Sequence, residues 1–259
     1  MTNIEVKILN PKVIKESEKM MVCAARLTQR GHLIKNLKDF MQLYETSYAQ
    51  ETVHTMVSLP HNTLRQFNMI NVVICGASRR FLAQITRRRI GVTFISTSLQ
   101  YSDYSDRSTF VVPYEILERG ETCTNLYLNA CEEAMGHYRW MVDTGIDKDA
   151  AGYITPQSLG NVLIISATPR AWSEMISQRI CRRNTKETRY IMLQIWQKLY
   201  TLNPILFGVS STGASCMRDK CVEGKFNCKN SIKEYKENDF TPLKIIETDF
   251  PLFRKGDSK

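Results

Sequence analysis

Three consecutive arginines, Arg87–Arg89, precede a run of hydroxyl side chains. A guanidinium group donates paired hydrogen bonds in a fixed plane, which suits the oxygens of phosphate and carboxylate groups. Neighbouring residues of a helix point in different directions, so the triplet could reach two adjacent anionic groups. Further donors follow at Thr93, Ser96, Thr97 and Ser98. The pattern indicates a nucleotide site, and the alternative is a solvated basic surface.

The positive charge of the chain is concentrated in short clusters. The net charge is +9 and the pI is near 9.1, which favours an anionic partner. The clusters lie at 87–89, 179–183 and 218–229, and such separate groups suit discrete anion sites better than a continuous nucleic-acid track. A basic nucleic-acid-binding module is therefore a weaker hypothesis, and we expect no nucleic-acid partner.

The elements around the triplet can be predicted from hydrophobic patterning. Residues 66–78 are rich in β-branched and apolar side chains, which predicts a buried strand ending at Gly76. The stretch that follows places Phe81, Leu82 and Ile85 on one helical face, so the triplet should lie at the end of a helix. Cations there are stabilised by the negative end of the helix dipole, which by itself could explain the arginines.

A second strand and two helices are predicted further along the chain. Residues 161–167 should form a buried strand, after which Thr168 can cap a helix that starts at Pro169. That helix should run to about Cys181, and another should span 184–202. The cluster Arg179, Arg182 and Arg183 then also lies at a helix end.

The rest of the chain adds strands and helices to one compact domain. We predict strands over 3–9 and 108–113 and helices over 13–29, 33–49 and 114–144. From Gly208 onward no periodicity is visible. The prediction is a single α/β (α+β) domain over residues 1–210, followed by an irregular, cysteine-containing tail over 211–259.

The residues around the triplet resemble the core of the flavin-dependent thymidylate synthases. That family has a histidine and a small hydroxyl residue, then a strand, a helix with a glutamine, an Arg-His-Arg triplet and a serine with a tyrosine after it. The matching residues are His61, Thr63, Gln84, Arg87–Arg89, Ser98 and Tyr101. The resemblance continues downstream at Pro156, Arg170, Arg179 and Glu187. It implies a central, mostly antiparallel sheet flanked by helices.

The resemblance also implies a chemistry. Family members methylate C5 of deoxyuridylate with FAD, methylenetetrahydrofolate and NADPH, in active sites between the subunits of a homotetramer. The flavin carries the difficult step, so no protein nucleophile is required and we assign no catalytic residue. Transferred by position, the expected cofactor-binding residues are Thr63, Arg87, Arg88, Arg89, Thr168, Arg170 and Glu174. The expected substrate-binding residues are Gln84, Ser96, Ser98, Gln100 and Arg179.

The sequence departs from the family at several of these positions. Arg88 replaces the central histidine, Thr168 an asparagine, and Glu174 a histidine or asparagine. Gln100 and Gly152 stand where the family has arginines that help to hold the substrate nucleotide. Each such charge-assisted bond contributes about 1.5–3 kcal/mol, so deoxyuridylate binding should weaken. Two hypotheses about the function follow. The protein is an enzyme acting on a pyrimidine nucleotide monophosphate, or it is a non-catalytic paralogue with a structural or regulatory role.

Several cysteines lie in the C-terminal segment and could be metal ligands. A zinc ion could be held by Cys216, Cys221 and Cys228 together with Cys181. Their spacing lacks the paired two-residue gaps of a zinc ribbon, so reduced tail cysteines are favoured and no metal is assigned.

No signal-peptide pattern or apolar run of roughly 20 residues is present, so we expect a cytoplasmic protein with no membrane partner.

Overall fold

The computed structural model describes residues 4–48, 50–59, 61–106, 109–229 and 240–254. Its centre is a four-stranded sheet in the order β1-β2-β4-β3. The strands are β1 (Glu5–Ile8), β2 (Ile70–Ser78), β3 (Val92–Ser96) and β4 (Gly160–Ala167), and every pairing is antiparallel. The predicted antiparallel sheet flanked by helices is therefore confirmed.

The central strands form because their side chains are buried on the helical side of the sheet. Ile70, Val72 and Ile74 of β2 are fully buried, as are Leu163 and Ile165 of β4. The pairing of β2 with β4 shifts register between Cys75 and Ala77, where Gly76 adopts a φ of 80° that favours glycine. This bulge lies just before the chain leaves the sheet.

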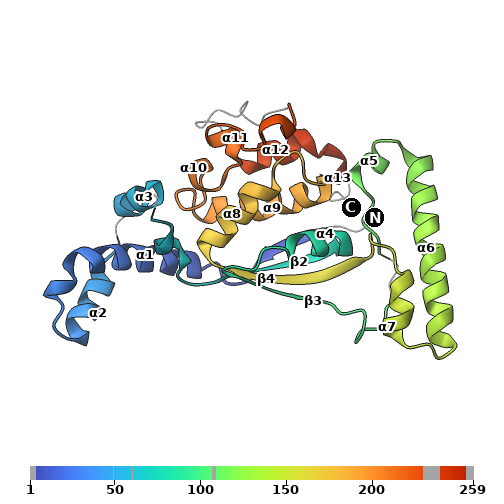
Figure 1. Cartoon of the computed structure of the whole chain (residues 1–259), viewed down its shortest axis with the longest axis horizontal. Coiled ribbons are helices and arrows are strands. Elements are labelled where there is room, and N and C mark those ends of the chain that lie inside the picture. The colour runs from blue at the N-terminus through green and yellow to red at the C-terminus, as the bar shows by residue number, and fades with distance from the viewer. Residues whose placement is uncertain (1–3, 49, 60, 107–108, 230–239, 255–259) are drawn as a thin grey trace.

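Helices cover one side of the sheet and extend beyond both of its ends (Figure 1). The covering helices are α4 (Arg79–Ile85), α8 (Pro169–Arg179) and α9 (Lys186–Leu202), with α12 (Pro242–Asp249) packed on α9. At one end lie α1 (Val13–Arg30) and α2 (Leu37–Thr46), and at the other α6 (Glu121–Asp143) and α7 (Lys148–Ala151). The remaining helices are η1 (Gly31–Leu33), α3 (Gln50–Ser58), η2 (Asn62–Gln66), α5 (Tyr114–Leu117), η3 (Gly152–Ile154), α10 (Val209–Thr212), α11 (Ser215–Arg218), η4 (Gly224–Phe226) and α13 (Pro251–Arg254).

Three local predictions differ from the structure. The helix predicted over 114–144 is broken into α5 and α6, because Gly120 has a φ of 92°, which a helix does not accommodate. Within the described part of 108–113, the predicted strand is reduced to one bridge between Phe110 and Leu159. The helix α4 ends at Ile85 with Thr86 as its C-cap, so the arginine triplet lies beyond the helix.

The C-terminal segment is more ordered than the predicted irregular tail. Ile245, Ile246 and Phe250 are buried in the main core, together with residues of α8 and α9. Asp249 accepts hydrogen bonds from Arg189 at 2.5 Å and from Arg182 at 3.5 Å. Only 6% of the Arg189 side chain is exposed, so Asp249 neutralises a buried charge.

Replacing Asp249 tests whether the C-terminal helices belong to the folding unit. Removing one partner of a buried ion pair leaves an unpaired charge and costs about 3–5 kcal/mol. We expect Asp249→Ala to lower the free energy of unfolding by an amount of this order in urea denaturation. The matched control is the exposed Asp143→Ala, which removes the same charge. If both variants unfold at the same urea concentration, the ion pair does not stabilise the fold.

Candidate functional site

The arginine triplet lies at a cavity of about 390 Å³. The cavity wall combines the segment after α4 with the first two turns of α8 and one residue of η2. It is lined by Gln66, Arg87, Arg88, Arg89, Ile90, Gly91, Thr168, Arg170, Ala171 and Glu174. We call it the arginine pocket. Six of the seven predicted cofactor-binding residues thus line one cavity.

Strand pairing brings the two halves of this pocket together. Val92 at the start of β3 pairs with Ala167 at the end of β4, so the preceding loop meets the start of α8. The Thr168 backbone N–H donates to the Gly91 carbonyl oxygen at 3.1 Å. Gly91 has a φ of 69°, and a Cβ there would lie 3.3 Å from Thr168 Oγ1. Glycine therefore permits both the turn and the close approach.

Thr168 fixes the start of α8 as its N-cap. Its Oγ1 accepts a hydrogen bond from the Ala171 N–H at 3.2 Å, and Pro169 occupies the first helical position. This confirms the capping predicted from the sequence. The cap sets the direction of α8, and with it the positions of Arg170 and Glu174 in the pocket.

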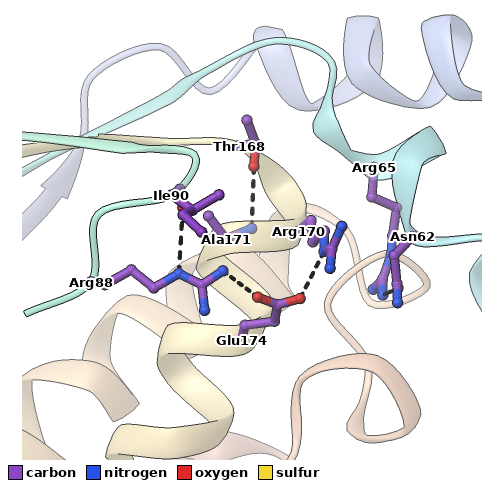
Figure 2. Close-up of polar contacts among 8 residues, drawn as sticks. All are labelled: Asn62, Arg65, Arg88, Ile90, Thr168, Arg170, Ala171 and Glu174. Carbon is purple, nitrogen blue, oxygen red and sulfur yellow. Dashed lines mark hydrogen bonds and ion pairs between the residues drawn. The ribbon is translucent and has the colours of Figure 1, made fainter.

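Glu174 bridges two arginines of the pocket (Figure 2). Its Oε1 accepts from Arg170 Nε at 2.7 Å, and its Oε2 is paired with Arg88 Nη2. Burial by itself would raise the pKa of Glu174, but the hydrogen bonds from Arg170 and Arg88 outweigh it, and the pKa lies below its ordinary value. Glu174 is therefore ionised at neutral pH. Arg88 and Glu174, two positions where the resemblance implies other residues, form one ion pair.

Gln84 and Arg179 form a second group close to the triplet. Arg179 Nη2 donates to the Gln84 carbonyl oxygen at 3.0 Å. The Gln84 side-chain oxygen accepts from the hydroxyls of Thr188 at 2.7 Å and Thr185 at 3.2 Å. Burial lowers the pKa of Arg179, and the nearby charge of Arg87 lowers it further. Among the described residues no carboxylate forms an ion pair with Arg87 or Arg179, so this region is strongly positive.

The other predicted substrate residues lie apart from the arginine pocket within one chain. Ser96 ends β3, and Ser98 Oγ accepts from the backbone N–H of Gln100 at 3.1 Å in the turn that follows. A Cβ on Gly152 would lie 3.3 Å from Leu99 Cβ. Gln100 and Gly152, where the resemblance implies arginines, are therefore neighbours in space.

Thr63 is the one predicted cofactor residue that does not line the arginine pocket. It lies on η2, whose last residue, Gln66, does line it. The sequence analysis missed Gln66, Ile90, Gly91 and Ala171. The glycine two residues after the triplet was an available signal, because such a position often requires a positive φ.

The described residues contain no group of three or more His, Cys, Asp or Glu side chains arranged to hold a metal ion. Burial raises the pKa of the Cys181 thiol, and the neighbouring Cys228 and Cys216 raise it further, which favours the protonated thiol. In the described part of the chain, no helix has the length and apolar composition to span a bilayer.

Comparisons with a family model and with known protein sequences identify the same family. A family model described as thymidylate synthase complementing protein matches residues 12–205. The flavin-dependent thymidylate synthase of Geobacter sulfurreducens is 23% identical over 216 residues, covering 82% of this chain and 89% of the relative. That of Saccharolobus solfataricus is 22% identical over 219 residues, covering 83% and 78%.

Two solved structures share the fold. The UMP/dUMP methylase PolB from Streptomyces cacaoi, bound with 5-Br dUMP, aligns with a TM-score of 0.67 and 17% identity over 82% of this chain and 97% of that one. Thymidylate Synthase X from Helicobacter pylori, with FAD and dUMP, aligns with a TM-score of 0.56 and 19% identity over 79% and 97%. With the family model matching most of its length, this protein is a divergent member of the flavin-dependent thymidylate synthase family.

Proposed function

We propose that this protein binds FAD in the arginine pocket and methylates C5 of a pyrimidine nucleotide. Methylenetetrahydrofolate would be the carbon donor and NADPH the reductant, as in the family. The observation that carries the proposal is the convergence of Arg87, Arg88, Arg89, Thr168, Arg170 and Glu174 on one cavity.

The donors of the arginine pocket fit a dinucleotide cofactor. Four arginines and one glutamate give the lining an excess of positive charge, which suits a pyrophosphate. Gly91 lets the backbone approach a ligand closely at the pocket wall. Bound FAD would supply the redox chemistry, which the side chains lining this pocket do not. The protein's part is to bind, orient and stabilise negative charge.

Gln84 and Arg179 are the proposed substrate-binding residues close to the triplet, and Arg87, assigned to the cofactor, lies beside them. The side-chain oxygen of Gln84 already accepts from two threonine hydroxyls, so its amide nitrogen remains to donate to a ligand. Donors from all three residues suit the carbonyl and phosphate oxygens of a pyrimidine nucleotide monophosphate. Because Gln100 and Gly152 supply no charge, we propose that the phosphate is held differently from the family pattern or that a different nucleotide is accepted.

We further propose a cytoplasmic homotetramer whose sites are completed by neighbouring chains. Ser96, Ser98 and Gln100 do not line the arginine pocket of their own chain. The sheet also exposes apolar side chains: Ile95 is 69% exposed on β3, and its pairing partner Ile164 is 38% exposed on β4. Exposed apolar sheet surface favours association with another chain.

One observation supports the alternative, a catalytically degenerate paralogue acting as a structural or regulatory subunit. Gln100 and Gly152, where the resemblance implies arginines, lie together at Leu99. A chain impaired there could still contribute its arginine pocket to a site shared with an active partner. Such a chain would not methylate a nucleotide alone.

Flavin retention tests the cofactor proposal. Protein incubated with FAD and desalted is expected to keep the visible absorption of oxidised flavin. Arg170→Gln removes one charge-assisted contact of about 1.5–3 kcal/mol, so the Kd for FAD should rise roughly ten- to a hundredfold. The control is Arg139→Gln on α6, whose side chain pairs with Glu132. A wild-type protein that stays colourless even from excess FAD would contradict the enzyme and favour the degenerate subunit.

Glu174→Gln should strengthen FAD binding. The substitution keeps one acceptor oxygen, enough for one of the two arginines, and removes the negative charge that competes with the cofactor phosphates. We expect the Kd for FAD to fall by roughly tenfold, as for one charge-assisted contact. The difference should be present at neutral pH and disappear only below pH 4.5, the ordinary pKa of a glutamate, where the lowered pKa of Glu174 is finally reached. The control is Glu133→Gln, at an exposed glutamate. Weaker FAD binding by Glu174→Gln would show that the carboxylate chiefly positions the arginines.

Gln100→Arg should restore nucleotide affinity if the phosphate lies near Leu99. One added charge-assisted bond corresponds to roughly a tenfold lower Kd for dUMP, measured by calorimetry on the FAD-loaded protein. Gln42→Arg on the exposed face of α2 gives the same change in net charge. Equal dUMP affinities of the two variants would place the phosphate elsewhere.

A further inference from the structure

A second cavity, of about 360 Å³, shares only Glu174 with the arginine pocket. Its walls come from η2, from α8 and from residues 211–223. The last of these segments follows residue 205, where the family match ends. Apart from Glu174, no residue that we assigned to cofactor or substrate lines this cavity. It is therefore a feature that the proposed function does not use.

Arg65 places an unsatisfied donor at this cavity. Its Nη2 donates to Asn62 Oδ1 at 2.7 Å, whereas Nη1 is buried without a hydrogen-bond partner among the described residues. Figure 2 shows Arg65 and Asn62 on η2, beyond Arg170 as seen from Arg88. Burial lowers the pKa of Arg65, and although Glu174 opposes this, the charges of Arg170 and Arg218 lower it further. Buried donors normally have partners, so the guanidinium group of Arg65 is incompletely compensated beside the cavity.

Arg218 reaches the same cavity from the C-terminal segment. It is the last residue of α11, and its Nη2 donates to Ser177 Oγ on α8 at 3.0 Å. Ser177 Oγ in turn donates to the Gly213 carbonyl oxygen at 2.9 Å. These contacts hold the guanidinium group of Arg218 against α8, on the cavity wall, in the vicinity of Arg65.

Both carboxylates of the cavity wall are already engaged by other arginines. Glu174 pairs with Arg88 and Arg170, and Glu223 pairs with Arg183 at 2.8 Å. No carboxylate forms an ion pair with Arg65 or Arg218 in the part of the chain that the structure describes. Two guanidinium groups that repel each other, with one buried N–H unsatisfied, are stabilised by an anion between them.

We propose that this cavity binds the phosphate group of a small phosphorylated molecule, between Arg65 and Arg218. Two guanidinium groups from different segments, together with Ser215 and Gln178, surround the space with donors on several sides. A tetrahedral phosphate presents acceptor oxygens in several directions, whereas a planar carboxylate presents two in one plane. The cavity has room for a phosphate with a small organic group. This assigns a role to Arg218, the first residue of the basic cluster at 218–229.

Calorimetric titration of the full chain tests the site with two probes, inorganic phosphate and phenyl phosphate. Arg218→Gln should raise the Kd of the phosphate probes by roughly tenfold or more, the loss expected for one charge-assisted contact. Arg65→Gln should raise the Kd of the phosphate probes by a similar factor. Arg218→Gln serves as the independent variant because Arg218 lies nearer the surface than Arg65. Arg139→Gln removes one positive charge on α6, away from the cavity, and should bind the probes as the wild type does.

Flavin absorption measured on the same samples separates this proposal from the proposed function. We expect Arg218→Gln to retain FAD as the wild type does. Equal probe affinities of the wild type and Arg218→Gln, or no binding of either probe to the wild type, would overturn the site. A parallel loss of FAD would also overturn it, by making the cavity part of the cofactor pocket. Tighter binding of phenyl phosphate identifies a phosphorylated metabolite as the ligand, and equal affinities identify free phosphate.

Discussion

The antiparallel pairing of β3 with β4 is the constraint on which the candidate site depends. Because Val92 pairs with Ala167, the loop that carries the arginine triplet must cross the start of α8. The hydrogen bond from Thr168 to Gly91 and the N-cap at Thr168 fix that crossing. Without this register, Arg87–Arg89 and Arg170 would belong to separate surfaces, the triplet beyond the end of α4 and Arg170 at the start of α8.

Charge balance is the second organising feature. The helical side of the sheet gathers arginines from α8, from the loop after α4 and from the C-terminal segment, and only some of them have carboxylate partners. Glu174 neutralises part of the arginine pocket, and Asp249 neutralises the buried Arg189. Arg87, Arg179, Arg65 and Arg218 remain without an ion pair among the described residues. Regions of uncompensated positive charge in partly buried surroundings are the physical basis for both proposed anion sites.

The departures from the family pattern are grouped rather than scattered. Arg88 and Glu174 each replace a family residue, and together they form an ion pair within the arginine pocket. Gln100 and Gly152 both lack an arginine, and they meet at Leu99. The first pair exchanges neutral or weakly basic groups for two opposite charges, which preserves the net charge of the pocket. If the resemblance holds at the second pair, two positive charges are removed from one place, and the change in ligand recognition should be confined to that place.

The sequence alone determined the buried strands, the Thr168 cap and the α/β architecture, because these depend on local periodicity and side-chain chemistry. The sequence did not reveal the break at Gly120, because a glycine with a positive φ has no periodic signature. It also did not reveal the packing of α12, because the apolar residues of this helix are few and are buried only by contact with α9. Only the tertiary structure decided that Glu174 links Arg88 to Arg170 and that Arg65 faces the region of Arg218. Such pairings join residues up to about 150 positions apart, and only the packing of η2, α8 and the C-terminal segment brings them together.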